Sequence, residues 1–513
     1  MLARCSGGAL LGLEAVEVSV EVDIAPGLPG LLMVGLADAA VQESRERVRA
    51  AVRNSGLRMP LTRVIVNLAP ADLRKEGPAF DLPIALAVLV ASGQLAPSLL
   101  EGIWAAGELG LDGSLRPVRG AVALAIAARR AGARALVIPQ ANATETALVE
   151  GLRVWAAADL PQVLALLANP ALASRTTLPC PATPAPADGP DLAEVQGQLH
   201  GRRALEIAAA GGHHLLLVGP PGSGKTMLAR RLPTLLPPLE RDETLELSQL
   251  YSVAGLLSQG IGLLQQRPFR APHHGCSSAA LVGGGSIPRP GELALAHRGV
   301  LFLDELAEFR RDVLNQLRQP LEEGEVWVSR ARQRVRFPCA IALVAATNPC
   351  PCGWFGDPLR PCRCGTGLRE RYWGKLAGPL MDRIDLQVVV RRLDAADLGR
   401  RYRQDSHQSA PESSAVVAGR VAAARSRMGQ RNPSGLANSR LSGQQLRQHG
   451  QFEPLALELW QQAMEQRGLS ARSSERVLRV ARTIADLSGD PQVGPGAVAE
   501  ALNYRSFDQG REP

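Results

Sequence analysis

Apolar and polar side chains follow two different periods along the first part of the chain. Residues 16–24 (VEVSVEVDI) alternate at every position, which is the pattern of a half-buried strand. Residues 41–55 carry valines spaced as on one face of a helix, with charged residues between them. Further strands are expected at residues 64–68 and 135–139, and further helices at 84–91 and 121–131. Residues 1–167 are therefore predicted to form an α+β domain.

Three apolar runs in the middle of the chain each end in polar residues. The runs are residues 215–218, 299–303 and 341–346. Continuous apolar runs are typical of parallel strands that are buried on both faces, and such sheets bind ligands at their carboxyl ends. The residues after the runs are GPPGSGKT (219–226), Asp304 with Glu305, and Thr347 with Asn348. An α/β ATPase core is therefore predicted over residues 191–411.

The segment GPPGSGKT has the form of a phosphate-binding loop between a strand and a helix. Its backbone N–H groups and the helix N-terminus would bind anionic oxygens. Lys225 would reach the β- and γ-phosphates of ATP, and the Thr226 hydroxyl would bind Mg²⁺. A chance glycine-rich loop is the alternative, but the strand–loop–helix context argues against it. The residues expected to cradle the nucleotide are Gly219, Pro220, Pro221, Gly222, Ser223, Gly224, Lys225 and Thr226.

The residues after the other two runs supply the remaining chemistry of hydrolysis. Asp304 would hold Mg²⁺ through a water molecule, and Glu305 would orient the attacking water. Asn348 would contact the γ-phosphate or that water. ATP and Mg²⁺ are therefore the expected cofactors of the core.

The last part of the chain has helix patterns only. Residues 412–513 are therefore predicted to form a helical lid. Before the core, residues 168–190 are rich in Pro and Ala and lack periodicity, so they are predicted to be a linker. The helices of the lid are expected at residues 414–430, 442–447, 454–467, 473–487 and 495–504.

Length and composition fit about three globular domains. The 513 residues are 46% hydrophobic and 21% charged, so each domain can bury a core. The sequence has no run of about 18 apolar residues, and residues 1–5 lack the form of a signal peptide. A cytoplasmic protein without membrane contact is expected.

The net charge of the chain resides in its C-terminal part. Residues 391–482 contain 16 arginines, no lysines and 8 acids, a net charge of +8 that equals the charge of the whole chain. Nucleic acid would bind such a surface, but a solvated arginine-rich surface fits equally well. A predicted hairpin at residues 324–337 adds Arg330, Arg332 and Arg334 near its turn, either for phosphate contact or as a solvated end.

Four of the eight cysteines form two close pairs, Cys350-x-Cys352 and Cys362-x-Cys364. In a reducing compartment such a group is more often a thiolate metal site than two disulfides. Zn²⁺ in tetrahedral coordination is the expected metal ion, and free or redox-active thiols are the alternative.

Two further segments of the core are each compatible with more than one role. Residues 267–274 (RPFRAPHH), with the glycines at 283–285, are predicted to be an insertion loop that reaches toward a substrate or a neighbouring subunit, because of their Gly and Pro content. Metal binding is the weaker alternative, since two adjacent histidines do not face one metal ion. Arg383 lies in the segment GPLMDRIDL (378–386). It acts either as an arginine finger in a neighbouring subunit's site or as a surface partner of Asp382 or Asp385.

The N-terminal domain resembles the proteolytic domain of Lon proteases, and more closely its inactive relatives in magnesium-chelatase-like ATPases. The resemblance rests on KEGPA (75–79) and on residues 107–120. Active Lon enzymes carry a nucleophilic Ser and a Lys at positions that correspond to Ala79 and Val122 here. The resemblance therefore implies a fold like ribosomal protein S5 domain 2 and a structural or assembly role.

Nearly the whole chain resembles the ComM/YifB family of magnesium-chelatase-like AAA+ ATPases. The shared segments, in chain order, are ALEIAAAGGHHLLLVGPPGSGKTMLAR, RPFRAPHH, LFLDELAEF, AATNPCPCG, GPLMDRIDL, GLSAR and RVLRVARTIADL. The resemblance implies Walker A at Lys225 and Thr226, Walker B at Asp304 and Glu305, sensor 1 at Asn348, an arginine finger at Arg383, sensor 2 at Arg472 and an adenine contact at Val195.

The same resemblance implies a homo-hexameric ring that acts on DNA, branched or single-stranded. Its expected activity is ATP-driven branch migration in natural transformation and homologous recombination, with recombination proteins as further partners. A magnesium-chelatase-type motor subunit that works through a partner protein is the alternative, although the sequence shows no integrin-like metal-coordinating domain. An ATP-dependent protease fits less well, because Ala79 and Val122 cannot form a Ser–Lys dyad.

Overall fold

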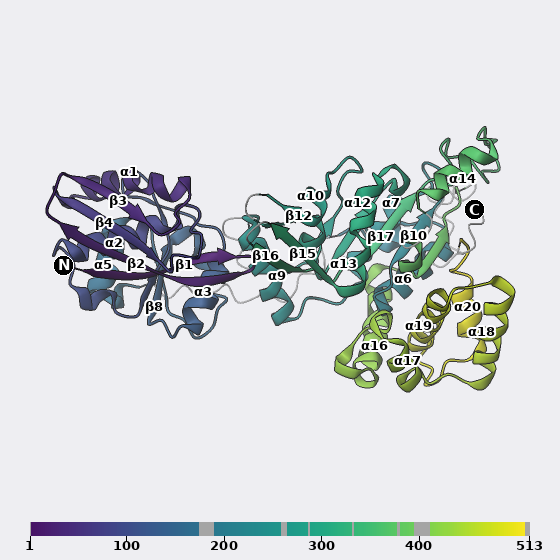
Figure 1. The fold of residues 1–513 in the computed structure, drawn as a ribbon. Helices are drawn as coiled ribbons and strands as arrows, with labels where there is room; N and C mark the ends of the chain where they lie inside the picture. Colours follow the sequence, from purple (N-terminus) through teal and green to yellow (C-terminus); the bar gives the residue numbers. More distant parts are fainter. Residues whose placement is uncertain are drawn as a thin grey trace.

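The computed structural model describes residues 2–173, 189–257, 264–285, 288–330, 333–376, 380–393 and 411–507. Figure 1 shows an N-terminal domain at one end, a central domain around a parallel sheet, and a group of helices beside the central domain. Most of the predicted linker (174–188) and the hairpin residue Arg332 lie outside the described residues. Within those ranges, no helix is long and apolar enough to cross a membrane.

The N-terminal domain is built on a seven-stranded mixed sheet. Alternate side chains of its second strand, Val18, Val20 and Val22, are fully buried, as the period of two predicts. In sheet order the strands are β3 (Gly30–Val34), β4 (Arg63–Ala69), β2 (Glu14–Ala25), β1 (Ala3–Leu11), β5 (Ile103–Ala105), β8 (Ala135–Pro139) and β9 (Val154–Ala157), and a separate hairpin joins β6 (Glu108–Leu109) to β7 (Leu115–Arg116). The strands predicted in this domain are confirmed.

The helices of this domain follow the predicted patterns. All eleven residues of α2 (Asp81–Ala91) are buried, because residues 82–91 are apolar on every side and the Asp81 carboxylate pairs with Arg47. Helix α1 (Ala39–Asn54) instead buries one face, and the Asp38 side chain accepts a hydrogen bond from the backbone N–H of Val41 at its start. The remaining helices are α3 (Ala121–Arg130), α4 (Ala143–Thr146) and α5 (Leu160–Ala168).

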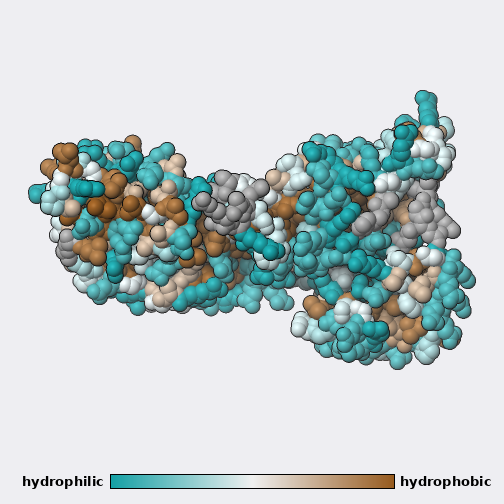
Figure 2. Space-filling model, in the orientation of Figure 1, coloured by the Kyte–Doolittle hydropathy of each residue, from teal (hydrophilic) through white to brown (hydrophobic). Residues whose placement is uncertain are grey.

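Figure 2 shows apolar residues at the surface of the N-terminal domain. Some of them lie on and around the edge strand β3, where large apolar side chains are exposed to solvent. Exposed apolar patches are typical of contact surfaces between proteins. The exposed residues in this region are Leu28, Leu32, Val34, Leu36 and Leu61.

The central domain is built on a five-stranded sheet in which every pair is parallel. Its strands, in sheet order, are β11 (Phe269–Arg270), β14 (Val300–Leu303), β17 (Ala342–Thr347), β10 (Leu215–Val218) and β18 (Leu386–Val389). The three predicted apolar runs therefore lie side by side in the order β14, β17, β10, and their carboxyl ends meet at one edge. The α/β prediction for the core is confirmed.

Helices cover this sheet and lead into its loops. They are α6 (Leu199–Gly211), α7 (Lys225–Ala229), α8 (Leu232–Leu235), α9 (Arg241–Ala254), α10 (Ser278–Val282), α11 (Glu292–Leu295), α12 (Arg311–Gln316), α13 (Arg318–Glu323) and α14 (Thr366–Gly374). Two small hairpins pair β12 (Gly283–Gly284) with β13 (Arg289–Pro290) and β15 (Glu325–Arg330) with β16 (Gln333–Pro338). The hairpin predicted at residues 324–337 is confirmed by the pairing of β15 with β16, and residues 331–332 of its predicted turn lie outside the described ranges.

The prediction that residues 267–274 form a projecting loop is wrong for their first half. Residues Phe269 and Arg270 form β11, which pairs with β14 at the sheet edge. The Arg270 guanidinium donates two hydrogen bonds of 2.7 Å to Glu292. A two-residue strand between prolines is too short to show a period of two, so the sequence pattern did not reveal it.

The C-terminal helices form a lid that packs on α6 of the core. Its hydrophobic residues share one cluster with α6 and with β10 and β18 of the central sheet. The lid consists of α16 (Ser414–Arg431), α17 (Gly443–His449), α18 (Pro454–Arg467), α19 (Ala471–Ser488) and α20 (Pro495–Leu502), so the predicted helices are confirmed.

The N-terminal domain contacts the central domain through α9 and the β15–β16 hairpin. The backbone N–H of Gly120 donates to the Ser252 carbonyl at 3.0 Å, and the Ser252 hydroxyl donates to Glu145 at 2.7 Å. At the hairpin, a Cβ placed on Gly12 would lie 2.3 Å from Val335 Cγ1. The first hairpin of the N-terminal domain therefore touches the arginine-bearing hairpin of the core.

Candidate active site

The loop between β10 and α7 has the backbone of a phosphate cradle. Gly224 begins α7 with φ +93°, a left-handed conformation that favours glycine. Gly219 lies so close to the end of β18 that an added Cβ would be 2.1 Å from the Val390 carbonyl oxygen. The two glycines therefore permit the tight turn that directs backbone N–H groups toward an anion.

Lys225 is folded back onto this loop. Its Nζ donates hydrogen bonds to the carbonyls of Gly219 (2.6 Å) and Pro220 (3.0 Å) and to Asn348 Oδ1 (3.2 Å). The side chain is 8% exposed, and burial lowers the pKa of its ammonium to about 8, although Asp304 and Glu305 act in the opposite direction. Neutral carbonyl and amide oxygens thus satisfy a cation that phosphate oxygens would hold more strongly.

Thr226 and Asp304 form the part of the site that fits Mg²⁺. The Thr226 hydroxyl donates to Asp304 Oδ2 at 2.9 Å, although the two residues are 78 positions apart. A hydroxyl and a carboxylate are the hard oxygen ligands that Mg²⁺ prefers, with water and phosphate completing its octahedron. These two residues could therefore hold the ion against the phosphates of a nucleotide.

Glu305 adopts an unusual backbone conformation directly after β14. Its φ is +52°, in the left-handed region that is costly for a residue with a long side chain. The side chain is 54% exposed, and its Oε2 lies 3.0 Å from His274 Nδ1. The Glu305 carboxylate is therefore half-exposed and lies beside His274, and its role in orienting an attacking water stays a prediction.

His274 is a residue near the site that the sequence did not reveal. Its ring lies 4.0 Å from the ring of His273, centroid to centroid, and contacts the Glu305 carboxylate. The sequence pattern of two adjacent histidines argues only against a shared metal ion. The informative signal was its position after a sheet strand whose neighbour carries Glu305.

Asn348 directly follows β17, where a polar residue was predicted. Its amide oxygen accepts from Lys225, and the Thr347 hydroxyl before it lies 3.1 Å from the Tyr372 hydroxyl of α14. Asn348 therefore lies beside the phosphate loop, as its predicted role requires. The structure brings Lys225, Thr226, Asp304 and Asn348 together.

Val195, the predicted adenine contact, lies just after a short helix (Leu192–Glu194) and is 3% exposed. Its side chain belongs to the hydrophobic cluster of the core, and its carbonyl accepts from Arg202. The nearby Gln198 donates to the Ser223 carbonyl of the phosphate loop at 3.2 Å. The segment therefore adjoins the loop, and the adenine contact stays a prediction.

The two arginines expected to assist hydrolysis form a separate group. Arg383 is buried, and its guanidinium lies 2.7 Å from Glu322 Oε1 of α13 and donates to the Arg318 carbonyl. Arg472, at the start of α19, has a side chain that is 68% exposed and lies 3.7 Å from the same Glu322 oxygen. Both arginines therefore meet at one carboxylate, at the boundary between core and lid.

Asp385, one of the two carboxylates suggested as a partner of Arg383, is bound by other groups. The Asp385 carboxylate is 2% exposed and is bound by Arg476 of α19, by the ring of His213 and by the backbone N–H of His214. Burial acts to raise the pKa of Asp385, but Arg476 and His213 hold it well below its usual range. Asp385 therefore fastens the lid to the core and is not available to Arg383.

Many of the C-terminal arginines are engaged inside the molecule. Arg425 donates to the Ala209 carbonyl of α6, and Arg482 is fully buried in bonds to Asp486 and three carbonyls. Such bonds fix the lid helices to one another and to the core, so the net charge of this region is a weak sign of a nucleic-acid surface. Further pairs are Arg420 with Glu206 and Glu412, Arg431 with Asp486, and Arg479 with Glu475.

The hairpin arginines have local partners as well. The Arg334 guanidinium lies 4.3 Å from the centre of the Trp327 ring, and Arg336 pairs with Glu325 at 2.9 Å. Both side chains remain exposed, while the alternating residues Val335 and Phe337 are buried. The exposed face of β16 is therefore basic.

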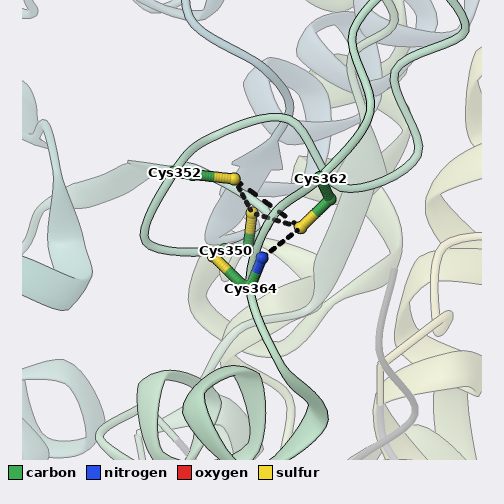
Figure 3. A group of neighbouring side chains, drawn as sticks. All are labelled: Cys350, Cys352, Cys362 and Cys364. Atoms are coloured by element: carbon green, nitrogen blue, oxygen red, sulfur yellow. Dashed lines mark hydrogen bonds between the residues drawn. The ribbon is translucent and has the colours of Figure 1, made fainter.

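The four cysteines of the two CxC pairs converge, as Figure 3 shows. Their sulfur atoms all lie within 4.8 Å of one another, and the closest pairs are 3.3 to 3.6 Å apart. Tetrahedral zinc with Zn–S bonds of about 2.3 Å places its sulfurs about 3.8 Å apart. The predicted grouping of Cys350, Cys352, Cys362 and Cys364 is confirmed, and the donor set fits Zn²⁺.

The two positions predicted to correspond to the Lon dyad carry apolar side chains that pack against the domain core. Ala79 packs against a cluster that contains Ala121 and Leu124, and Val122 is fully buried in a neighbouring cluster. Neither residue offers a nucleophile or a base.

Comparisons with known proteins agree with this architecture. Family models described as magnesium chelatase, subunit ChlI, match residues 191–398, 20–142 and, for the C-terminal part of that subunit, 411–505. An uncharacterized protein YifB of Salmonella typhimurium is 43% identical over 501 residues, which is 98% of this chain and 96% of that protein. The competence protein ComM of Haemophilus influenzae is 41% identical over 511 residues, covering 99% and 98% of the two chains.

A more distant match involves a Lon protease of Salinispora arenicola, which is 29% identical over 180 residues, or 32% of this chain and 23% of that protein. The fold and the phosphate loop define an AAA+-type protein of the magnesium-chelatase class. Within that class, the chain belongs to the ComM/YifB family.

Proposed function

We propose that this protein is an ATP-hydrolysing motor that acts on DNA as a homo-hexameric ring. The single observation that carries hydrolysis is the convergence of Lys225, Thr226, Asp304 and Asn348 at the carboxyl edge of one parallel sheet. Lys225 and the loop N–H groups would bind the phosphates of ATP, and Thr226 with Asp304 would hold Mg²⁺. Glu305, which lies next to Asp304 and contacts His274, would orient water.

The proposed action on DNA is supported more by similarity to the competence protein ComM than by the net charge of the C-terminal region. The family includes a protein named for competence, and the proposed activity is branch migration in natural transformation and homologous recombination. The exposed Arg334 and Arg336 on β16 supply a basic face that could contact phosphates, and recombination proteins are the proposed further partners.

ATP hydrolysis by the purified full chain, with and without four-way-junction DNA, tests this proposal. We expect DNA to stimulate hydrolysis, and Lys225→Ala and Glu305→Gln to abolish both the basal and the stimulated rates. Hydrolysis that is indifferent to every DNA structure would overturn the DNA part and leave the ATPase part standing.

The hairpin is tested by replacing Arg334 and Arg336 together with alanine. Each lost phosphate contact should reduce the slope of log K against log salt by about 0.9 for duplex DNA. Arg4→Ala is the matched control, because Arg4 is an exposed arginine on the N-terminal sheet. Equal salt slopes in all three proteins would exclude the hairpin as a DNA contact.

A magnesium-chelatase-type motor subunit is the second candidate, and the matches to chelatase family models favour it. Such a subunit would convert ATP hydrolysis into work on a partner protein. DNA-independent hydrolysis that a protein partner stimulates would support this candidate over the first.

A further inference from the structure

The segment between β17 and α14 is a long loop that lies on the phosphate site. Residues 349–365 form no helix or strand, although all of them are described. Most of their side chains are exposed or half-buried, and Leu359 is 72% exposed. A loop of this length without an apolar core of its own has little to hold it in one conformation.

Direct contacts nevertheless place this loop against the nucleotide-binding residues. A Cβ added to Gly353 would lie 2.8 Å from Pro221 Cδ and 3.9 Å from Asn348 Cγ. Gly353 has φ +83°, so the chain turns back at this point over the phosphate loop. Cys350 follows Asn348 by two residues and is fully buried.

The far end of the loop is fixed to the same sheet edge. Trp373 of α14 donates from Nε1 to the Pro349 carbonyl at 3.0 Å, and Tyr372 contacts the Thr347 hydroxyl. The two CxC pairs thus lie between β17, which ends at Thr347, and α14, whose residues contact Thr347 and Pro349. Both ends of the loop are anchored, and four sulfur atoms meet between them (Figure 3).

We propose that Cys350, Cys352, Cys362 and Cys364 bind one Zn²⁺ ion, and that this ion holds the loop against Pro221 and Asn348. Four thiolates saturate a tetrahedral zinc ion, so the site would be structural and would leave no position for a substrate. The metal would close the loop at both pairs and fix Gly353 over the phosphate loop. Metal binding is thereby linked to nucleotide affinity. The proposed DNA activity is not needed for this inference.

Metal analysis of the purified full chain tests the site. We expect one zinc per chain in the wild-type protein and loss of stoichiometric zinc in Cys352→Ser and Cys362→Ser. Cys276→Ser is the matched control, because Cys276 lies outside the cluster, and it should retain zinc. Cobalt exchanged into the wild-type protein should give the ligand-field spectrum of a tetrahedral tetrathiolate site. A metal-free, folded wild-type protein whose four thiols react with maleimide would overturn the proposal.

The link to the nucleotide site needs a readout other than hydrolysis. Removing zinc from the wild-type protein with a chelator should expose residues 349–365 to protease and weaken binding of a fluorescent ATP analogue at least tenfold. Restoring Zn²⁺ should reverse both effects, which separates loss of the metal from irreversible unfolding. Unchanged protease protection and unchanged affinity after zinc removal would overturn the positional role, whereas the metal analysis would stand by itself.

Discussion

Two groups of polar residues bear on ATP hydrolysis, and they differ in their partners. The phosphate-site group, Lys225, Thr226, Asp304 and Asn348, converges within one chain and bonds mainly to itself and to loop carbonyls. The arginine group, Arg383 and Arg472, lies at the boundary of core and lid and meets at Glu322. One group is arranged to receive a nucleotide, and the other is occupied by a carboxylate of its own chain.

We propose that the two groups serve different nucleotides. Arginine fingers stabilise the charge that develops on a transferring phosphoryl group, and in many systems a neighbouring molecule supplies them. A ring in which the arginine group of one subunit faces the phosphate-site group of the next would complete each site from two chains. The proposed hexamer therefore explains why one chain holds both groups and does not join them.

The largest effect is expected from Arg383→Ala. Loss of an arginine finger lowers kcat by about 10³-fold, because the transition-state charge is no longer neutralised, while ATP binding changes little. Arg130→Ala is the control, since Arg130 is an exposed arginine of the N-terminal domain. Steady-state ATPase assays and nucleotide-binding titrations provide the measurements.

A mixing experiment separates action within one chain from action between chains. Lys225→Ala keeps its Arg383, and Arg383→Ala keeps its phosphate-site group. If Arg383 acts in a neighbour's site, an equimolar mixture of the two inactive variants should regain part of the wild-type rate. A mixture that stays inactive after demonstrated subunit exchange would contradict the action of Arg383 in a neighbouring subunit's site.

Asp385→Ala is expected to give the next largest effect, on stability. Removing this buried carboxylate leaves Arg476 and the backbone N–H of His214 without their partner, at a cost of about 3–5 kcal/mol. The transition of the core and lid in urea should shift to a lower concentration. Asp382→Ala is the matched control, because Asp382 lies in the same turn and should change the transition little.

The Asp385 carboxylate also makes the stability of the folded protein depend on pH. The pKa of Asp385 in the folded protein is held below the value of about 3.9 in the unfolded chain. Its contribution to stability is therefore complete above pH 4 and is lost as the pH falls below it. Stability curves of wild type and Asp385→Ala should converge in acid, and parallel curves would contradict this assignment.

The structure also shows which features a sequence can predict. Thr226 and Asp304 could be placed because each follows an apolar run, and parallel strands bring their carboxyl ends together. The pairing of Arg476 with Asp385 could not be predicted, because the residues are 91 positions apart and neither belongs to a local period. The same holds for His274, whose contact with Glu305 depends on the two-residue strand β11.

The protonation of Lys225 gives a smaller, pH-dependent effect on the phosphate-site group. Its pKa of about 8 means that the ammonium loses its proton as the pH rises through that value in the nucleotide-free protein. ATP favours the charged form, so its dissociation constant should rise by up to about tenfold per pH unit above pH 8. Lys225→Arg should remove this dependence, because arginine stays charged. A flat profile in the wild-type protein would show that Lys225 does not titrate near pH 8 before ATP binds.

The smallest effect is expected from Glu322→Gln, which bears directly on the arginine group. In the isolated chain Glu322 neutralises Arg383, and this pair must open before the guanidinium can face a phosphate in a neighbouring subunit. Because the Glu322 side chain is 43% exposed, solvent screens the pair, and its loss is worth about 0.5–1 kcal/mol. The ATPase rate of the assembled protein should therefore rise about two- to fivefold, with unchanged affinity for ATP. Glu323→Gln, one position along the same helix, is the control. A lower rate would mean that Glu322 positions Arg383 for its role, and that the arginine group is already in its working arrangement.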